Sequence, residues 1–411
     1  MIIVVGGGAA GLICALAAKR AGKEVIILEK NKKIGRKICI TGKGRCNLTN
    51  IADKNNIMSA FSENKKFLMS ALNSFSNQDL ISFFENLGIE TKVERGGRVF
   101  PVSDNALDIV DGFYKALEKE KIPLHTDTEA IELLIIDDQQ KVFGIKTNKG
   151  DFKGAVVIAT GGLSYPKTGS TGTGYRLAQS IGHKIISTFP SLVPLEVVER
   201  QRAKSLQGLS LKNVEASAFI NKKKMASFFG EMVFTHYGLS GPIILSLSRL
   251  CVPALENKDL VEIKIDLKPA LSSEQLDKSL LRLLDEHRQQ NLNNLLEKRS
   301  LKKLIPILLE LSNIDPYQKG YSVTKEQRKK LVSIFKEISF IINGHKGYEE
   351  AIVTRGGIDL KEINPKTMAS KIIDNIYFCG EVLNIDGFTG GYNLQAAFST
   401  GYVAGLYGEE V

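Results

Sequence analysis

Three glycines near the N-terminus are spaced to hold a phosphorylated ligand. Gly6, Gly8 and Gly11 form the pattern Gly-x-Gly-x-x-Gly directly after a short apolar run. Gly6 permits a tight turn, Gly8 lets backbone N–H groups approach a pyrophosphate, and Gly11 allows a helix to pack closely on a strand. Glu29 follows 18 residues after Gly11, where its carboxylate can accept both hydroxyls of a ribose. Together these residues predict the binding of an adenine dinucleotide.

The segments around these glycines must then form a β-α-β unit. Residues 2–5 are an apolar run with the length of a buried parallel strand, and residues 12–21 read as a helix that ends at Gly22. Residues 24–28 form a second β-branched run that stops at Glu29. This order places the glycines in the first turn and the acid at the end of the second strand, as a dinucleotide fold requires.

A compact basic stretch follows Glu29. Residues 30–45 contain seven Lys and Arg and no Asp or Glu, within a chain whose formal net charge is +10. A chain that follows a polyphosphate backbone is expected to spread its basic residues over more faces. A single cluster close to the glycine turn favours contact with a small phosphorylated ligand. A solvated, lysine-rich loop is the alternative.

Composition excludes several classes of protein. The chain has 411 residues, 43% of them apolar, so it can bury a sizeable core in one large domain or in two to three smaller ones. No secretory signal and no apolar run long enough for a membrane span are visible. The five cysteines show no C-x-x-C spacing, which favours reduced thiols without a disulfide framework or a metal site. We expect a soluble cytoplasmic protein.

A second glycine-rich segment follows the run 151–158, which reads as a single strand. It begins with Thr160 and Gly161 and continues to Gly169-x-x-Gly172-x-Gly174, where a helix is expected over 175–181. Small residues after a strand are typical of backbone that passes close to a cofactor. The segment is either a second phosphate loop or a turn near the cofactor. The missing second β-α-β unit favours the turn.

The C-terminal region returns to a nucleotide-binding pattern. A strand is expected over 372–379, followed by Gly380 and Glu381. Asn393 is expected to cap a helix that runs to about Leu406. The N-terminus of that helix would present its partial positive charge to an electron-rich ring edge.

The order of segments predicts one domain interrupted by an insertion. Residues 1–190 and 346–411 read as two parts of a nucleotide-binding domain. Between them, residues 191–270 read as a β-rich domain and residues 271–345 as a helical subdomain with leucine stripes that belong to a core. Thr324 and Gln327 have the spacing of a capping box.

Six blocks of sequence resemble one family. They are VVGGGAAGL, GRKICITGKGRCNLTN, GGRVFPVSD, ATGGLSYPKTGSTGTGY, FTHYGLSGP, and the pair VTRGGIDLKEINPKTMASK and FCGEVLNIDGFTGGYNLQAAFSTGY. Together they span essentially the whole chain. The chain resembles the bacterial BaiN-like flavoproteins, which include proteins described as aminoacetone oxidases, within the glutathione-reductase and fumarate-reductase superfamily. Lys43 departs from the pattern, because such proteins often have a glycine there.

The resemblance implies an α/β fold: a Rossmann-like FAD-binding domain with an inserted β-barrel-like plus helical domain. It also implies tightly bound FAD. The glycine turn would approach the pyrophosphate, the region after Glu29 would hold the adenosine and the phosphates, and the C-terminal helix would lie near flavin N1 and O2. The implied cofactor-binding residues are Gly6, Gly8, Ala10, Gly11, Glu29, Lys30, Arg36, Lys37, Arg45, Cys46, Asn47, Ala130, Thr160, Gly161, Gly380, Glu381, Asn393, Leu394 and Gln395.

The candidate catalytic residues are His236, Arg355 and Tyr392. His236 is the only one of the five histidines inside a family-like block, and Arg355 could anchor an anionic substrate. Cys46 has no partner for redox chemistry and is expected to be a packed residue near the flavin. A proton donor or acceptor is often required beside a flavin.

The leading interpretation is an FAD-dependent oxidoreductase that acts on a small organic substrate. Electrons would be exchanged with NAD(P)H as a transient donor or with O2. The alternative is a flavin-dependent RNA-modifying or RNA-binding protein, and a flavin-bearing sensor without turnover is a third. The mixed charge of residues 271–340 makes nucleic acid an unlikely partner. We expect no membrane partner. The sequence leaves the oligomeric state and the substrate open.

Overall fold

The computed structural model describes residues 1–61, 64–136 and 140–408. The chain divides into two compact units. The first comprises residues 1–191 and 348–411, and the second comprises residues 192–347. Each is described by itself.

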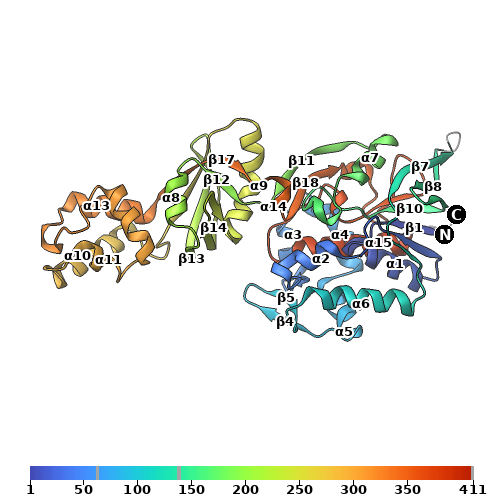
Figure 1. Cartoon of the computed structure of the whole chain (residues 1–411), viewed down its shortest axis with the longest axis horizontal. Helices are drawn as coiled ribbons and strands as arrows, with labels where there is room; N and C mark the ends of the chain where they lie inside the picture. The colour runs from blue at the N-terminus through green and yellow to red at the C-terminus, as the bar shows by residue number, and fades with distance from the viewer. Residues whose placement is uncertain (62–63, 137–139, 409–411) are drawn as a thin grey trace. The chain divides into compact units, whose positions relative to one another are not determined.

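The first unit is built on a five-stranded parallel sheet in the order β19-β10-β1-β2-β6. Its strands are β1 (Ile2–Val5), β2 (Val25–Leu28), β6 (Leu124–His125), β10 (Ala155–Ile158) and β19 (Ile376–Phe378). The run that precedes the glycines is fully buried at the centre of this sheet (Figure 1). Helix α1 (Ala9–Arg20) follows the glycine turn and leads to β2. The predicted β-α-β unit and the α/β Rossmann fold are confirmed.

The run 151–158, predicted as one strand, is two strands in different sheets. Its first half, β9 (Gly150–Lys153), joins the antiparallel sheet of β7 (Ala130–Ile136) and β8 (Lys141–Thr147), and its second half is β10. Gly154 separates them with φ 152°. A Cβ there would lie 2.2 Å from the Met1 carbonyl oxygen, so only glycine allows the chain to cross between the sheets at this point.

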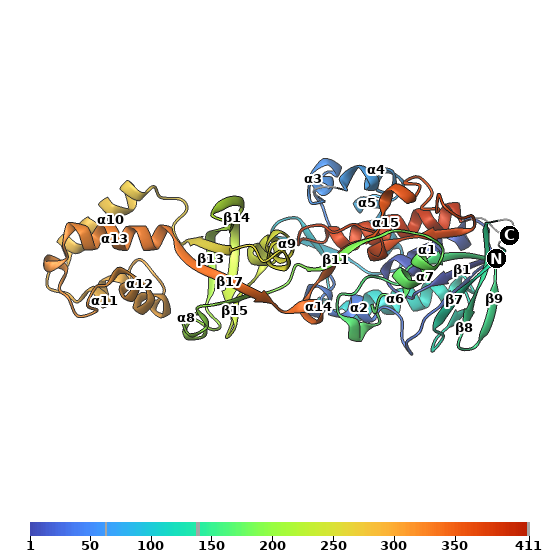
Figure 2. The same ribbon diagram turned by 90° about the horizontal axis from the view of Figure 1, so that it is seen from above.

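The two ends of the chain meet in the pair α1 and α15 (Tyr392–Tyr407) (Figure 2). The helices approach closely because α15 carries two glycines on the contact face. A Cβ on Gly401 would lie 2.2 Å from the Ala10 carbonyl oxygen, and one on Gly405 would lie 2.1 Å from that of Cys14. The expected cap of α15 was wrong: the N-cap is Gly391, and the Asn393 side chain instead bonds to both backbone groups of Gly387.

The remaining elements of the first unit surround this sheet and helix pair. They are α2 (Arg36–Ile40), β3 (Thr49–Asn50), α3 (Lys54–Ser59), α4 (Lys65–Ser74), α5 (Asn77–Asn86), β4 (Thr91–Glu94), β5 (Arg98–Pro101), α6 (Ala106–Lys119), α7 (Thr173–Ser180), β11 (Ile185–Ser191) and β18 (Val353–Ile358). Helix α14 (Gly347–Glu350) begins where the second unit ends.

The second unit contains a closed barrel in the order β12-β15-β14-β13-β16-β17. Alternate residues of β13 and β16, such as Ala218 and Ile263, are buried and fill its interior. The barrel strands and the helices of this part are β12 (Leu195–Val197), α8 (Arg200–Ser205), β13 (Ser210–Ile220), β14 (Lys223–Phe234), β15 (Gly238–Ser240), α9 (Pro242–Glu256), β16 (Val261–Asp266) and β17 (Ile338–His345).

Four helices lie between β16 and β17 and form a group beside the barrel (Figure 2). They are α10 (Ser273–Glu286), α11 (Leu292–Leu296), α12 (Ile305–Ser312) and α13 (Lys325–Lys336). The leucine stripe of α10 is buried, as predicted. The capping box of Thr324 and Gln327 is confirmed at the start of α13. Across the described residues, no helix combines the length and the apolar character needed to cross a membrane.

A buried histidine links three segments of the first unit. His183 lies between α7 and β11 and is 3% exposed. Its Nδ1 lies 3.0 Å from the Glu362 carboxylate, and its Nε2 lies 2.9 Å from the Ser370 hydroxyl. That hydroxyl already accepts the N–H groups of Ile372 and Ile373, so it donates to Nε2. The ring is therefore neutral, with its proton on Nδ1 facing Glu362.

This burial predicts acid sensitivity. Desolvation outweighs the attraction of Glu362 and lowers the pKa of His183 below its usual 6.5. The unfolded histidine binds a proton more readily, so the free energy of unfolding should fall below about pH 6.5, by at most about 1.4 kcal/mol per pH unit. Urea unfolding of His183→Gln over this pH range should show a shallower slope, whereas the exposed control His125→Gln should keep it. Equal slopes in both variants would contradict the assignment.

Candidate functional site

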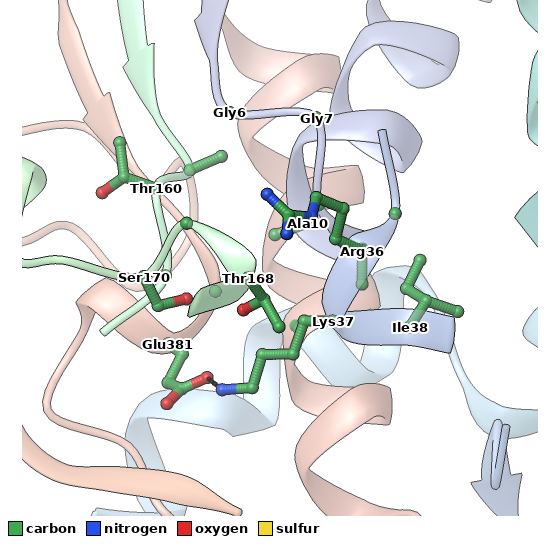
Figure 3. A pocket seen from close by; sticks show the side chains of 18 of the residues that line it. Gly6, Gly7, Ala10, Arg36, Lys37, Ile38, Thr160, Thr168, Ser170 and Glu381 are labelled. Atoms are coloured by element: carbon green, nitrogen blue, oxygen red, sulfur yellow. Dashed lines mark hydrogen bonds and ion pairs between the residues drawn. The ribbon is translucent and has the colours of Figure 1, made fainter. Parts of the chain in front are cut away.

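A pocket at the carboxyl ends of the central strands collects residues that lie far apart in the sequence (Figure 3). Its walls come from the glycine turn, α2, the segments after β10 and β19, and the first turns of α15. The predicted residues that line it are Gly6, Gly8, Ala10, Glu29, Lys30, Arg36, Lys37, Ala130, Thr160, Gly161, Gly380, Glu381, Asn393 and Leu394. Ligands of open parallel sheets bind at this edge.

The glycine turn presents the N-terminus of α1 to the pocket. Gly8 is the N-cap, with extended backbone angles of φ −90° and ψ −173°. A Cβ built on Gly8 meets no atom within 4 Å, whereas one on Gly11 would lie 1.9 Å from the Gly6 carbonyl oxygen. The space at Gly8 is thus open toward the pocket, while Gly11 serves helix packing and does not line it. A diphosphate fits this arrangement because free N–H groups and the helix dipole point at the open space.

Glu29 is held in place at the end of β2. One carboxylate oxygen accepts the N–H of Gly7 at 2.8 Å, and the other accepts the N–H and the side-chain amide of Asn31 at 2.8 and 2.6 Å. The residue is 8% exposed and lines the pocket. A carboxylate oxygen has two lone pairs, so the oxygen that accepts only the Gly7 N–H retains acceptor capacity for a ribose hydroxyl.

Four of the seven basic residues in 30–45 line the pocket: Lys30, Lys33, Arg36 and Lys37. The Lys30 ammonium donates to the Thr171 hydroxyl at 2.6 Å, and burial lowers its pKa despite the nearby carboxylates of Glu129 and Glu29. The Arg36 guanidinium donates to the Asn31 side-chain oxygen at 2.6 Å. The pocket wall therefore carries a concentration of positive charge suited to phosphate groups.

Lys37 and Glu381 join α2 to the segment after β19. The Lys37 ammonium lies 2.6 Å from one Glu381 oxygen and also contacts the Ser164 hydroxyl. The other Glu381 oxygen accepts from that hydroxyl and, at 2.8 Å, from the Thr354 N–H. The hydroxyl of Thr354 in turn accepts the N–H groups of Leu163 and Ser164. Three segments of the chain thus converge on the carboxylate of a fourth at the pocket wall.

The second glycine-rich segment also contributes to this pocket. Thr168, Gly169, Ser170 and Thr173 line it next to Gly161. Sequence reasoning missed Thr168 and Ser170 as site residues, and it also missed Ser164 and Thr354. The glycine spacing pointed to the segment, but no local signal distinguished individual hydroxyls.

Several predicted cofactor residues lie outside the lining of this pocket among the described residues: Gly11, Arg45, Cys46, Asn47 and Gln395. Arg45 pairs with Glu94 at 2.7 Å and with Asp104 at 3.1 Å, and its guanidinium lies 4.1 Å from the centroid of the Phe100 ring. The proposed contact of Arg45 with the ribityl chain stays a prediction.

The other three side chains are fixed by their surroundings. Burial raises the pKa of the Cys46 thiol to about 12, as suits a packed residue rather than a reactive thiolate. The Asn47 amide, turned to satisfy its neighbours, accepts the Gly391 N–H at 3.0 Å and so ties the 41–47 segment to the cap of α15. Gln395 is fully buried and accepts the Thr49 hydroxyl at 2.6 Å.

None of the candidate catalytic residues is among the described residues that line this pocket. Arg355 lies in β18 and Tyr392 opens α15, both in the first unit, and burial raises the pKa of Tyr392. His236 lies in the second unit, between β14 and β15, with its ring 4.8 Å from that of Tyr237. Their catalytic roles stay predictions.

Lys43 adopts a conformation that favours glycine. It is exposed, with φ 60° and ψ 44°, in the left-handed region. This geometry costs an ordinary residue about 1 kcal/mol, so Lys43→Gly should raise the melting temperature by about 2 °C. Thermal unfolding of Lys43→Ala is the matched control, because alanine removes the charge but keeps the strain. An equal rise in both variants would show that charge, not backbone strain, is responsible.

Known proteins resemble this chain along almost its whole length. The family model described as "HI0933-like protein Rossmann domain" matches residues 1–407. A "3-dehydro-bile acid delta(4,6)-reductase" from Clostridium scindens is 34% identical, covering 98% of this chain and 97% of its own length. A "Ribosomal RNA dihydrouridine synthase" from Haemophilus influenzae is 34% identical with the same coverage, and one from Escherichia coli is 33% identical.

Among solved structures, 3-ketosteroid Δ1-dehydrogenase from Sterolibacterium denitrificans superposes with a TM-score of 0.54 at 14% identity, covering 98% of both chains. That likeness concerns the fold. The family match over nearly the whole chain, with relatives above 30% identity along almost their full length, makes this protein a member of the HI0933-like family of FAD-dependent oxidoreductases.

Proposed function

We propose that this protein reduces a C=C bond that is conjugated to a carbonyl group. The name of the Clostridium scindens relative describes reduction of a 3-oxo steroid at its 4,6 double bonds, and dihydrouridine is uridine with its ring C=C bond reduced. The observation that carries the proposal is that relatives with such different substrates, each 34% identical to this chain, share this one type of reaction.

Bound FAD would supply a hydride from flavin N5. The chain's own residues would bind the FAD and would place partial positive charge beside it. We propose that Glu29 and Lys30 bind the adenosine end and that Arg36 and Lys37 bind the phosphates. Asn393 and Leu394 place the first turn of α15 at the pocket wall, where its unpaired N–H groups favour negative charge.

The proposed electron donor is NAD(P)H, because a reductase must be supplied with electrons and O2 can only accept them. Anaerobic mixing with NADPH should bleach the flavin absorbance. Addition of a 4-ene-3-oxo steroid, still without O2, should then restore the absorbance. If neither NADPH nor NADH bleaches the flavin, and an amine gives peroxide release, the result would instead favour an amine oxidase.

A uridine base in RNA is the second candidate substrate. The mixed charge of residues 271–340 alone argues against a nucleic-acid partner, but the net charge of the whole inserted unit favours one. Residues 192–347 hold 25 Lys and Arg against 17 Asp and Glu, which accounts for an excess of 8 in a chain whose net charge is +10. In the first unit, the basic stretch 30–45 is almost cancelled by acidic residues elsewhere. The inserted unit therefore carries most of the net positive charge, which favours a polyanionic partner.

Incubation of the holoprotein with NADPH and ribosomal RNA tests this candidate. Mass spectrometry of the digested RNA should show a nucleoside that is heavier than uridine by two hydrogens. Steroid reduction with unchanged RNA would restrict the proposal to small substrates.

A further inference from the structure

Two tyrosines of the second unit stand out from the surface of the helical group. Tyr317 is 76% exposed, more than any other large apolar side chain in the described residues, and Tyr321 is 57% exposed. Both lie in the connection between α12 and α13 (Figure 2). Lys319 lies between them in the sequence and is exposed. Aromatic rings of this size are usually buried or held at an interface.

The backbone beneath these side chains is held firmly. It runs beside residues 288–293 and forms four backbone hydrogen bonds with them: Asn293 N–H to Pro316, Leu292 N–H to Gln318, Gly320 N–H to Gln290 and Tyr321 N–H to Arg288, all between 2.9 and 3.1 Å. Gly320 is buried, and a Cβ there would lie 3.2 Å from the Leu284 carbonyl oxygen. The tyrosines therefore project from a preorganised base, which lowers the entropy lost on binding.

The side chains alternate about this backbone. Gln318 turns inward, where its amide donates to the Ser322 carbonyl at 2.7 Å and to the Gln327 side chain at 2.9 Å. Tyr317, Lys319 and Tyr321 are exposed, whereas Gly320 is buried and Gln318 is partly buried. The outer surface thus presents aromatic, basic and aromatic side chains in sequence.

The net charge of the second unit is opposite in sign to that of a nucleic acid. Residues 192–347 hold 25 Lys and Arg against 17 Asp and Glu, and Arg288 beside Tyr321 is exposed. Tyrosine faces stack on any unpaired base, and interleaved cations follow the phosphates of the same strand. We propose that Tyr317, Lys319 and Tyr321 form a docking surface for single-stranded RNA. This inference rests on the RNA candidate of the proposed function.

The test is RNA binding by the FAD-loaded protein, measured by fluorescence anisotropy with a labelled single-stranded oligonucleotide at two salt concentrations. Each Tyr→Ala change at 317 or 321 should weaken binding about tenfold. Lys319→Gln should weaken it less and should reduce its dependence on salt. The matched controls are Tyr407→Ala and Lys66→Gln, exposed residues of the same types in the first unit, which should leave binding unchanged.

The outcomes separate this inference from the proposed reductase. Loss of RNA binding by Tyr317→Ala/Tyr321→Ala, with unchanged FAD content and steroid reduction, supports the docking surface. Wild-type affinity of that double variant, or binding only to vesicles of acidic lipid, overturns it. A wild-type protein that reduces the steroid but binds no RNA overturns the docking surface and leaves the reductase standing.

Discussion

The variant Gly8→Leu is expected to fold and to lose FAD. The Cβ position of Gly8 has no atom within 4 Å, and its backbone is extended, so leucine can be accommodated without strain in the protein itself. Its side chain would instead occupy the space that a diphosphate needs beside the N-terminus of α1. We expect the affinity for FAD to fall at least 100-fold, a loss of about 2.7 kcal/mol, in equilibrium titrations of the deflavinated protein.

The comparison with Gly11→Ala separates a blocked ligand site from a broken fold. Even a single methyl group at Gly11 would lie 1.9 Å from the Gly6 carbonyl oxygen, so strand and helix must move apart. That variant should lose about 3 kcal/mol of stability. Circular dichroism should therefore show a native melting curve for deflavinated Gly8→Leu and a lowered one for Gly11→Ala. If the Gly8→Leu protein binds FAD with wild-type affinity, the diphosphate does not bind at this turn.

The local half of the site was predictable from the sequence because local chemistry determines it. The glycine spacing, the flanking apolar runs and Glu29 specify a β-α-β turn within 29 residues, and the structure places them at one pocket. The capping box of Thr324 and Gln327 is similarly local, since both hydrogen bonds form within one helical turn.

The other half depends on contacts between distant segments. Glu381 is held by Ser164, in the segment after β10, and by Thr354, in β18, which belong to no common motif. Asn393 is a residue type that often caps helices but lies two residues too late, because Gly391, with φ 96°, ends the preceding loop and takes the cap position. The roles of such side chains depend on tertiary contacts. They become visible only in the folded protein, where the sheet and the α1–α15 pair bring the two ends of the chain together.

The Lys37–Glu381 pair should control FAD affinity through charge. The ammonium lies 2.6 Å from the carboxylate, and both groups are partly exposed to the pocket, with side-chain exposures of 22% and 17%. Lys37→Met would leave the negative charge of Glu381 without its counter-ion, facing the site that a diphosphate would occupy. Repulsion between these negative charges should weaken FAD binding by about 10- to 100-fold, or about 1.4 to 2.7 kcal/mol.

A double-mutant cycle distinguishes this cause from a direct contact between Lys37 and the ligand. If Lys37 acts mainly by neutralising Glu381, then Lys37→Met/Glu381→Gln should recover most of the affinity lost by Lys37→Met, since the amide retains the size of the carboxyl group without its charge. If the ammonium binds a phosphate itself, the double variant should bind FAD as weakly as the single one. Lys32→Met is the matched control, because Lys32 belongs to the same basic stretch, is exposed and lies outside the pocket lining, so its titration should follow the wild type.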